Sequence, residues 1–244
     1  MNFQNLINRT IMLLSDHLQD SPVDQGHDIN HALIVFKHSQ SIIQHEPNLT
    51  DTQKLAIYLA SLLHDADDSK FFPESNDYQY ARKILQQLKL DSDIKDLVIY
   101  MISLVSCSKN KNNKVDPNWL LIPRWADRLE AIGEIGVVRA YLYSISNKHP
   151  LFIEETSRNS NLSAVVTKER FENFEGPSLS FIDHFYDKLL HLKNMNTDNQ
   201  YIKMEVERRH QVMSDFCLDF CKTGKINLDK INKWAREFNY CLII

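Results

Sequence analysis

The stretch from Leu55 to Asp65 reads Leu-Ala-Ile-Tyr-Leu-Ala-Ser-Leu-Leu-His-Asp and decides the fold class. Almost every side chain before His64 is apolar, which favours a helix that is buried around most of its circumference. An imidazole and a carboxylate then stand side by side where this helix ends. Both need polar partners, because an unpaired buried polar group is costly, and one divalent metal ion would serve both.

Two further polar side chains occur beside apolar helical stripes. His31 falls in the first turns of an amphipathic helix expected over about 29–44. Asp127 lies beside a second stripe, which includes Trp125 and Leu129. With the His-Asp pair they form a mixed nitrogen and oxygen set that suits Mn, Fe, Ni, Co or Mg. The set contains no thiolate, which argues against a structural zinc site.

Four ordered segments resemble the motifs of the HD-domain metal-dependent phosphohydrolases, in particular the small bacterial-type, nucleotide pyrophosphohydrolase-like members. The matching segments are Gly-His-Asp-Ile-Asn-His at 26–31, His-Asp-Ala-Asp-Asp-Ser-Lys-Phe at 64–71, Ala-Asp-Arg-Leu-Glu-Ala-Ile-Gly at 126–133, and the C-terminal residues 184–190 and 209–210. The resemblance covers about residues 20–223. It implies one divalent ion, with Mn favoured and Mg, Ni, Co or Fe as alternatives. The implied ligands are His31, His64, Asp65 and Asp127.

Asp68 and Lys70 match the acid and the lysine of the family's central motif. The resemblance implies that Asp68 orients or deprotonates the attacking water and that Lys70 offers a point charge to a phosphate. The spacing agrees, since a turn after Asp65 would return Asp68 to the metal side. Without the resemblance, Asp67 and Asp68 would be interpreted as an exposed acidic helix end.

His27 and Arg139 are implied to contact the substrate, again by resemblance alone. His27 has the alternative of a solvent-facing loop residue, with Asp28 as the N-cap of the following helix. Glu130, one turn after Asp127, is expected near the metal or in support of a ligand. The resemblance assigns no role to three further matching residues, Lys188, Arg209 and His210.

Composition favours an all-α fold, and the resemblance implies a single-domain helical bundle of the HD-domain type. The chain has 244 residues, of which 43% are hydrophobic and 25% charged, and only five glycines and seven prolines. We expect the HD core at about 20–145, an irregular segment at about 147–177 and C-terminal helices at about 178–240. The expected helices cover about 2–20, 29–44, 50–65, 75–89, 92–105, 178–194, 197–222 and 228–239. A further helix is expected to start afresh at Pro123 and to continue, bent at Gly133 and Gly136, to about Tyr143.

The charge pattern limits the partners. The formal net charge is -4 and no basic stripe occurs, which argues against a polymeric nucleic acid. No apolar run is long enough to span a bilayer, and the N-terminus lacks a signal-peptide pattern, so we expect a cytoplasmic protein and no membrane partner. The four cysteines, Cys107, Cys217, Cys221 and Cys241, are expected to be reduced. A homodimer is compatible with the sequence.

The function expected from these observations is hydrolysis of a small phosphorylated substrate, a nucleotide. Within the subgroup, the most concrete reaction is pyrophosphohydrolysis of a nucleoside triphosphate to a nucleoside monophosphate and pyrophosphate. One alternative is a nucleoside monophosphate phosphatase, similar to a 5'-nucleotidase. Another is a nucleotide- or metal-binding module without turnover.

Overall fold

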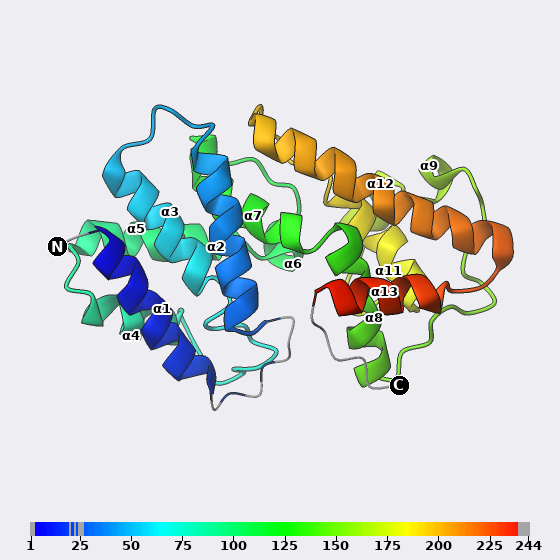
Figure 1. Cartoon of the computed structure of the whole chain (residues 1–244), viewed down its shortest axis with the longest axis horizontal. Helices are drawn as coiled ribbons and strands as arrows, with labels where there is room; N and C mark the ends of the chain where they lie inside the picture. The colour runs from blue at the N-terminus through cyan, green and yellow to red at the C-terminus, as the bar shows by residue number, and fades with distance from the viewer. Residues whose placement is uncertain (1–2, 20, 22, 24–26, 239–244) are drawn as a thin grey trace. The chain divides into compact units, whose positions relative to one another are not determined.

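The computed structural model describes residues 3–19, 21, 23 and 27–238, which form α-helices, short 3-10 helices and connecting loops (Figure 1). No β-strand occurs within these residues. The prediction of an all-α fold is therefore confirmed. The helices form two compact units, one of residues up to 127 with 197–201, the other of residues 128–196 and those from 202 onward.

The first unit is built around the apolar stretch that opened the sequence analysis. Its helices are α1 (Phe3–Gln19), α2 (Ile29–Ile43), α3 (Asp51–Leu63), α4 (Gln79–Gln87), α5 (Ser92–Ser103) and α6 (Cys107–Asn110), followed by the 3-10 helix η1 (Asn118–Leu121) and the start of α7 (Ile122–Glu130). Helix α3 packs against α1, α2 and α5. Contact on several sides explains why α3 is apolar around most of its circumference.

A capping box starts α3, as the sequence predicts. The Thr50 hydroxyl accepts a hydrogen bond from the Gln53 backbone N–H at 3.2 Å, and the Gln53 side chain accepts one from the Thr50 N–H at 2.8 Å. Each bond satisfies a backbone donor that the first turn of the helix leaves without an intrahelical partner.

The polar loop before η1 is held against the start of α7. Arg124 is almost fully buried, and its guanidinium donates to the carbonyls of Leu104, at 2.5 Å, and Asn113, at 2.8 Å. Pro123 lies in the first turn of α7. Backbone N–H groups in the first turn have no partner within the helix, so the missing N–H of proline costs no helical hydrogen bond there.

One helix of the prediction is two helices in the structure. Helix α7 ends at Glu130 and α8 (Gly133–Ser146) follows, where a single bent helix was expected. The break depends on Gly133, whose φ of +82° is costly for other residues, and on Gly136, where a Cβ atom would lie 2.3 Å from the Ala131 carbonyl oxygen. Arg209 closes the end of α7, since its guanidinium donates to the Leu129 carbonyl at 2.9 Å.

The second unit continues with α8 and carries most of the remaining helices. These are α9 (Leu162–Val165), α10 (Lys168–Glu172), α11 (Phe181–Asp187), the 3-10 helix η2 (Leu189–His191), α12 (Gln200–Thr223) and α13 (Leu228–Glu237). Helix α8 packs against α11 and α13. The helix expected over 178–194 is shorter, because the backbone leaves the helical conformation at Lys188.

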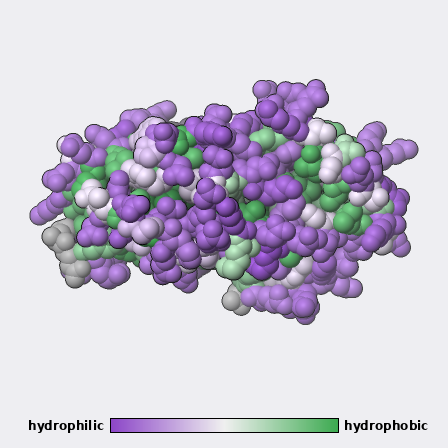
Figure 2. Space-filling model, turned by 90° about the horizontal axis from the view of Figure 1, so that it is seen from above, coloured by the Kyte–Doolittle hydropathy of each residue, from purple (hydrophilic) through white to green (hydrophobic). Residues whose placement is uncertain are grey.

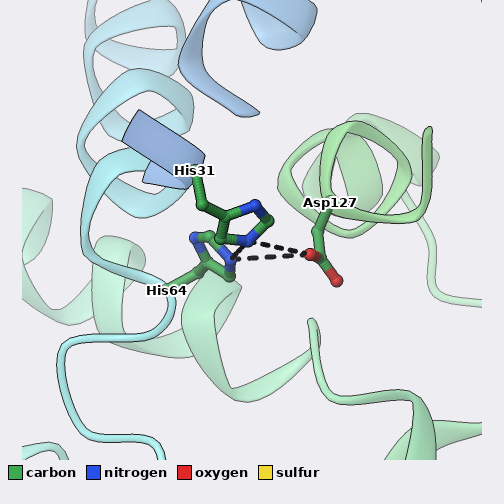
Figure 3. A group of neighbouring side chains, drawn as sticks. All are labelled: His31, His64 and Asp127. Atoms are coloured by element: carbon green, nitrogen blue, oxygen red, sulfur yellow. Dashed lines mark hydrogen bonds and ion pairs between the residues drawn. The ribbon is translucent and has the colours of Figure 1, made fainter. Parts of the chain in front are cut away.

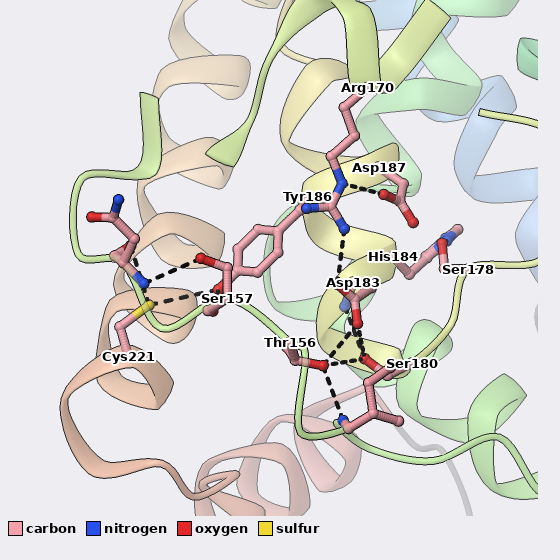
Figure 4. A network of polar contacts seen from close by, with 12 residues as sticks. Thr156, Ser157, Arg170, Ser178, Ser180, Asp183, His184, Tyr186, Asp187 and Cys221 are labelled. Atoms are coloured by element: carbon pink, nitrogen blue, oxygen red, sulfur yellow. Dashed lines mark hydrogen bonds and ion pairs between the residues drawn. The ribbon is translucent and has the colours of Figure 1, made fainter. Parts of the chain in front are cut away.

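The irregular segment expected at 147–177 contains α9 and α10 and is tied to α11 by buried polar contacts (Figure 4). The Arg170 guanidinium pairs with Asp187 and, at 2.8 Å, with Asp183. Asp183 also accepts hydrogen bonds from the hydroxyls of Thr156, at 2.8 Å, and Ser180, at 2.6 Å. A buried carboxylate with this many donors is a strong anchor, so these contacts give the segment a defined conformation.

Hydrophilic side chains cover most of the face drawn in Figure 2. Within the described residues, no helix is both long enough and apolar enough to cross a membrane. Cys217 and Cys221 are buried on α12, and Cys107 is half-buried. Cys241 and Gly26 lie outside the described residues.

Candidate metal centre

Three helices of the first unit bring His31, His64 and Asp127 together (Figure 3). His31 lies in the first turn of α2, where the Asp28 side chain caps the helix by accepting from the backbone N–H groups of Asn30 and His31. His64 is the C-cap residue of α3, and Asp127 lies on α7. Residues separated by up to 96 positions in the chain thus meet at one point.

The ligand atoms of all four predicted metal ligands lie close together. The Nε2 atoms of His31 and His64 are 3.2 Å apart. Each of these nitrogens lies 3.4 to 3.5 Å from an Asp65 carboxylate oxygen. Each also lies 3.5 to 3.6 Å from an oxygen of Asp127.

This spacing fits a single divalent ion. Adjacent ligands of an octahedral ion with bonds of about 2.1 Å lie about 3.0 Å apart, and tetrahedral ligands lie a few tenths of an ångström further apart. The observed separations of 3.2 to 3.6 Å therefore need only small movements. Imidazole nitrogen and carboxylate oxygen together form a set that suits Mn, Fe, Co, Ni or Mg.

The His64 ring is oriented by a backbone hydrogen bond. Its Nδ1 lies 2.9 Å from the carbonyl oxygen of Ser61, one turn earlier on α3. A carbonyl only accepts hydrogen bonds, so Nδ1 carries a proton, and Nε2 is the nitrogen that faces the other three side chains and offers its lone pair whenever the ring is neutral. A hydrogen bond of this kind to the second nitrogen fixes both the tautomer and the direction of a ligating histidine.

Electrostatics favour a cation at this point. Burial disfavours the charged form of His64, but the carboxylates of Asp65 and Asp127 outweigh burial and hold its pKa well above the ordinary value. Burial likewise favours protonation of Asp65 and Asp127, but the neighbouring imidazoles lower the pKa of both carboxyl groups. The field that favours a protonated imidazole here also favours a bound metal ion.

A second group of side chains adjoins the first through Asp65. Ligand atoms of His27, Asp65 and Asp68 lie within 4.8 Å of one another. The His27 ring lies 6.1 Å from that of His31 and 4.9 Å from that of Phe71. The structure therefore places His27 and Asp68, both expected in the site, beside the proposed metal ligand Asp65.

Lys70 and Arg139 are positioned differently from the residues above. The Lys70 side chain is 61% exposed, and its ammonium lies 3.9 Å from the Asp68 carboxylate. Lys70 is therefore a solvent-exposed neighbour of Asp68. Arg139 belongs to the second unit, where its guanidinium donates to the carbonyl of the buried residue Glu130 at 3.4 Å. Contact of Arg139 with a phosphate stays a prediction.

Asp67 has a structural role that the sequence did not reveal. Its carboxylate accepts hydrogen bonds from the backbone N–H groups of Tyr80 and Ala81, both at 2.8 Å, and from the hydroxyl of Ser75. Tyr78, the residue at the N-cap of α4, offers no side-chain hydrogen bond, so Asp67 replaces it from the preceding loop. Asp67 thereby fixes the loop that carries Asp65 and Asp68.

His17 supports the same loop from α1. Its Nε2 donates to the Ala66 carbonyl at 2.9 Å, directly after the proposed ligand Asp65. The ring stacks against Phe72, with centroids 4.8 Å apart, and Tyr80, at 4.3 Å. In the sequence His17 is only a polar residue near the end of an amphipathic helix, and no local pattern marks the contact.

Replacing His17 with alanine is expected to weaken divalent-metal binding by about tenfold, because partners that orient ligands typically contribute tenfold or more to metal affinity. His17→Gln, which retains a donor near the Ala66 carbonyl, should recover part of the loss. Titration of the metal-stripped proteins with Mn²⁺ measures the metal affinity of each variant and of the parent. Equal affinities for the parent and His17→Ala would exclude a positioning role.

No protein-family profile matches the chain. A protein of Acanthamoeba polyphaga mimivirus is 35% identical over 239 residues, which cover 90% of this chain and 98% of that protein. An HD-superfamily hydrolase from Bacillus thuringiensis has a similar structure, with a TM-score of 0.64, 26% identity and coverage of 91% of this chain and 97% of its own. The structure of Bacillus subtilis YpgQ in complex with ADP has a similar fold, with a TM-score of 0.62 and 21% identity. The match covers 97% of this chain and 97% of YpgQ.

Proposed function

Since the chain belongs to the HD-domain superfamily, in one family with the mimivirus protein, we propose that it hydrolyses nucleoside triphosphates to a nucleoside monophosphate and pyrophosphate with a divalent metal ion. The observation that carries the proposal is the convergence of two imidazoles and two carboxylates, with a third carboxylate, that of Asp68, beside them. The structural neighbour YpgQ binds ADP, which supports a nucleotide as substrate.

The proposed site contains metal ligands and, around them, side chains that act on water and phosphate. His31, His64, Asp65 and Asp127 would hold the metal, with Mn²⁺ as the preferred ion. When bound, a divalent ion supplies a Lewis acid that withdraws charge from the phosphoryl group and acidifies water. The residues that we propose for the chemistry and for the substrate act around it.

Asp68 is proposed to orient the attacking water and to accept its proton. Its carboxylate is 18% exposed and accepts a hydrogen bond from the Lys70 backbone N–H at 2.9 Å, which holds it in place. A fixed carboxylate next to the reacting water is the arrangement that general-base catalysis needs. His27, whose ring nitrogen lies within 4.8 Å of both Asp65 and Asp68, would contact the phosphate.

Lys70 is proposed to bind the polyphosphate. Its exposed ammonium is a point charge on a flexible stem, which suits a ligand that arrives from solvent. Each added phosphate brings more negative charge, which a protein of net charge -4 would otherwise repel. The bound metal and Lys70 would together offset this charge, so we favour attack at the α-phosphorus with pyrophosphate as the leaving group.

The products of hydrolysis test the proposal. The protein loaded in turn with Mn²⁺, Mg²⁺, Co²⁺ and Ni²⁺ would be incubated with nucleoside triphosphates and, separately, with nucleoside monophosphates. Pyrophosphate and a monophosphate in equal amounts are expected from the triphosphates. Inorganic phosphate released only from monophosphates would replace the proposal with a nucleotidase. Metal and nucleotide binding without any product would identify a binding module.

A further inference from the structure

The second unit contains a pocket of about 240 Å³, which we call the Lys193 pocket. It is bounded by α9, by the chain around η2 and by α12. Its polar wall consists of Ser163, His191, Lys193, Asn194, His210 and Ser214. Leu162, Val166 and Leu190 form the rest of its lining. None of the lining residues is acidic, and none belongs to the proposed metal centre.

Three groups of the polar wall meet at one atom. Nε2 of His210 lies 3.3 Å from the Lys193 ammonium and 3.3 Å from the Ser214 hydroxyl. An ammonium only donates hydrogen bonds, so Nε2 accepts and the His210 ring is neutral. Lys193 is an exposed residue of the lining, and it forms no ion pair with a carboxylate of the described residues, so its charge faces solvent and stays available to an anion that enters from outside.

The neutral state of His210 has a physical cause. Burial, followed by the nearby charge of Lys193, lowers its pKa to about 4. Its Nδ1 is also buried without a hydrogen-bond partner among the described residues. The only other titratable lining group, His191, has its pKa lowered mainly by burial, and its Nε2 donates to the Tyr186 carbonyl. The lining thus combines one exposed cation, two neutral imidazoles and hydroxyl groups. The nearby carboxylate that acts on His191, that of Asp187, lies outside the lining and is paired with Arg170.

We propose that the Lys193 pocket binds the phosphate group of a small molecule. Lys193 supplies the charge, and Ser163 with Asn194 supplies neutral donors. A bound phosphate would compensate the charge of Lys193 and favour proton uptake by His210, which would turn its Nε2 from an acceptor into a further donor. The ligand is small, because pockets for drug-sized molecules measure roughly 300–1,000 Å³. The apolar lining suits a short organic substituent.

Titration calorimetry of the full-length, metal-loaded protein with inorganic phosphate and with glycerol phosphate tests this proposal. Lys193→Gln is expected to weaken phosphate binding by at least about tenfold, the factor that a hydrogen bond to a charged group commonly contributes. Lys222→Gln, which removes the same charge from an exposed position on α12 outside the pocket, should bind as the parent does. Tighter binding of glycerol phosphate would identify a phosphorylated metabolite, and tighter binding of inorganic phosphate would identify the free ion.

A variant of the metal centre separates this proposal from the proposed function. His64→Ala should lose metal and turnover but keep the phosphate binding that Lys193→Gln removes. If folded Lys193→Gln protein binds phosphate as tightly as the parent, or if all phosphate binding disappears with His64→Ala, the Lys193 pocket is not a phosphate site. A parent protein that binds neither probe would overturn the proposal as well.

Discussion

Replacing His64 with alanine is expected to remove the divalent metal ion and to reduce hydrolysis to background. The imidazole contributes one of two nitrogen ligands, and its Nε2 lies 3.2 to 3.6 Å from the ligand atoms of the other three side chains. The variant keeps three of the four ligands: the His31 imidazole and two carboxylates, which are only 24% and 27% exposed. Three ligands bind a cation more weakly than four. Metal content after dialysis, measured by mass spectrometry, gives the result.

Folding must be shown to survive the substitution. Helix α3 is held by its apolar contacts with α1, α2 and α5, so circular dichroism of the variant should retain the helical spectrum. His45→Ala, at an exposed position beyond the end of α2, is the matched control and should keep both metal and turnover. Equal metal content in His64→Ala and the parent would refute the proposed ligand set.

Replacing Asp68 with asparagine is expected to lower kcat by about 10²- to 10⁴-fold, the usual contribution of a general base. The amide preserves the shape of the side chain and its hydrogen bond from the Lys70 backbone N–H, but it does not accept a proton from water. Metal should remain bound, because the four ligand side chains are unchanged. Steady-state kinetics and metal content, measured on the same preparation, give both values.

Comparison of kcat with metal content in the variant distinguishes a general base from a metal ligand at Asp68. A general base lowers kcat in the variant and leaves metal content at the parental level. Loss of metal in Asp68→Asn would instead make Asp68 a ligand, which its position within 4.8 Å of Asp65 and His27 allows. Asp16→Asn, at an exposed position on α1, controls for the loss of one negative charge.

Local patterns were sufficient to predict much of the first unit. The apolar run before His64 predicts a buried helix, and the Thr50 to Gln53 capping box predicts its start, because both depend on neighbours within four residues. Polar side chains beside apolar stripes pointed to His31 and Asp127, and the family motifs then implied that both are metal ligands. Their convergence with His64 and Asp65 was predicted by resemblance, and the structure brings their ligand atoms together.

The sequence by itself thus determined the helical class, the main helices and the candidate ligands, since these follow from periodicity and motif order. Only the tertiary structure decided what holds them in place. Asp67 caps α4, His17 supports the loop at Ala66, Arg209 closes α7 at Leu129, and Arg170 anchors the irregular segment to α11. The physical reason is that each of these contacts joins a side chain to a group at least 13 residues away, where no helical or strand period relates the two positions.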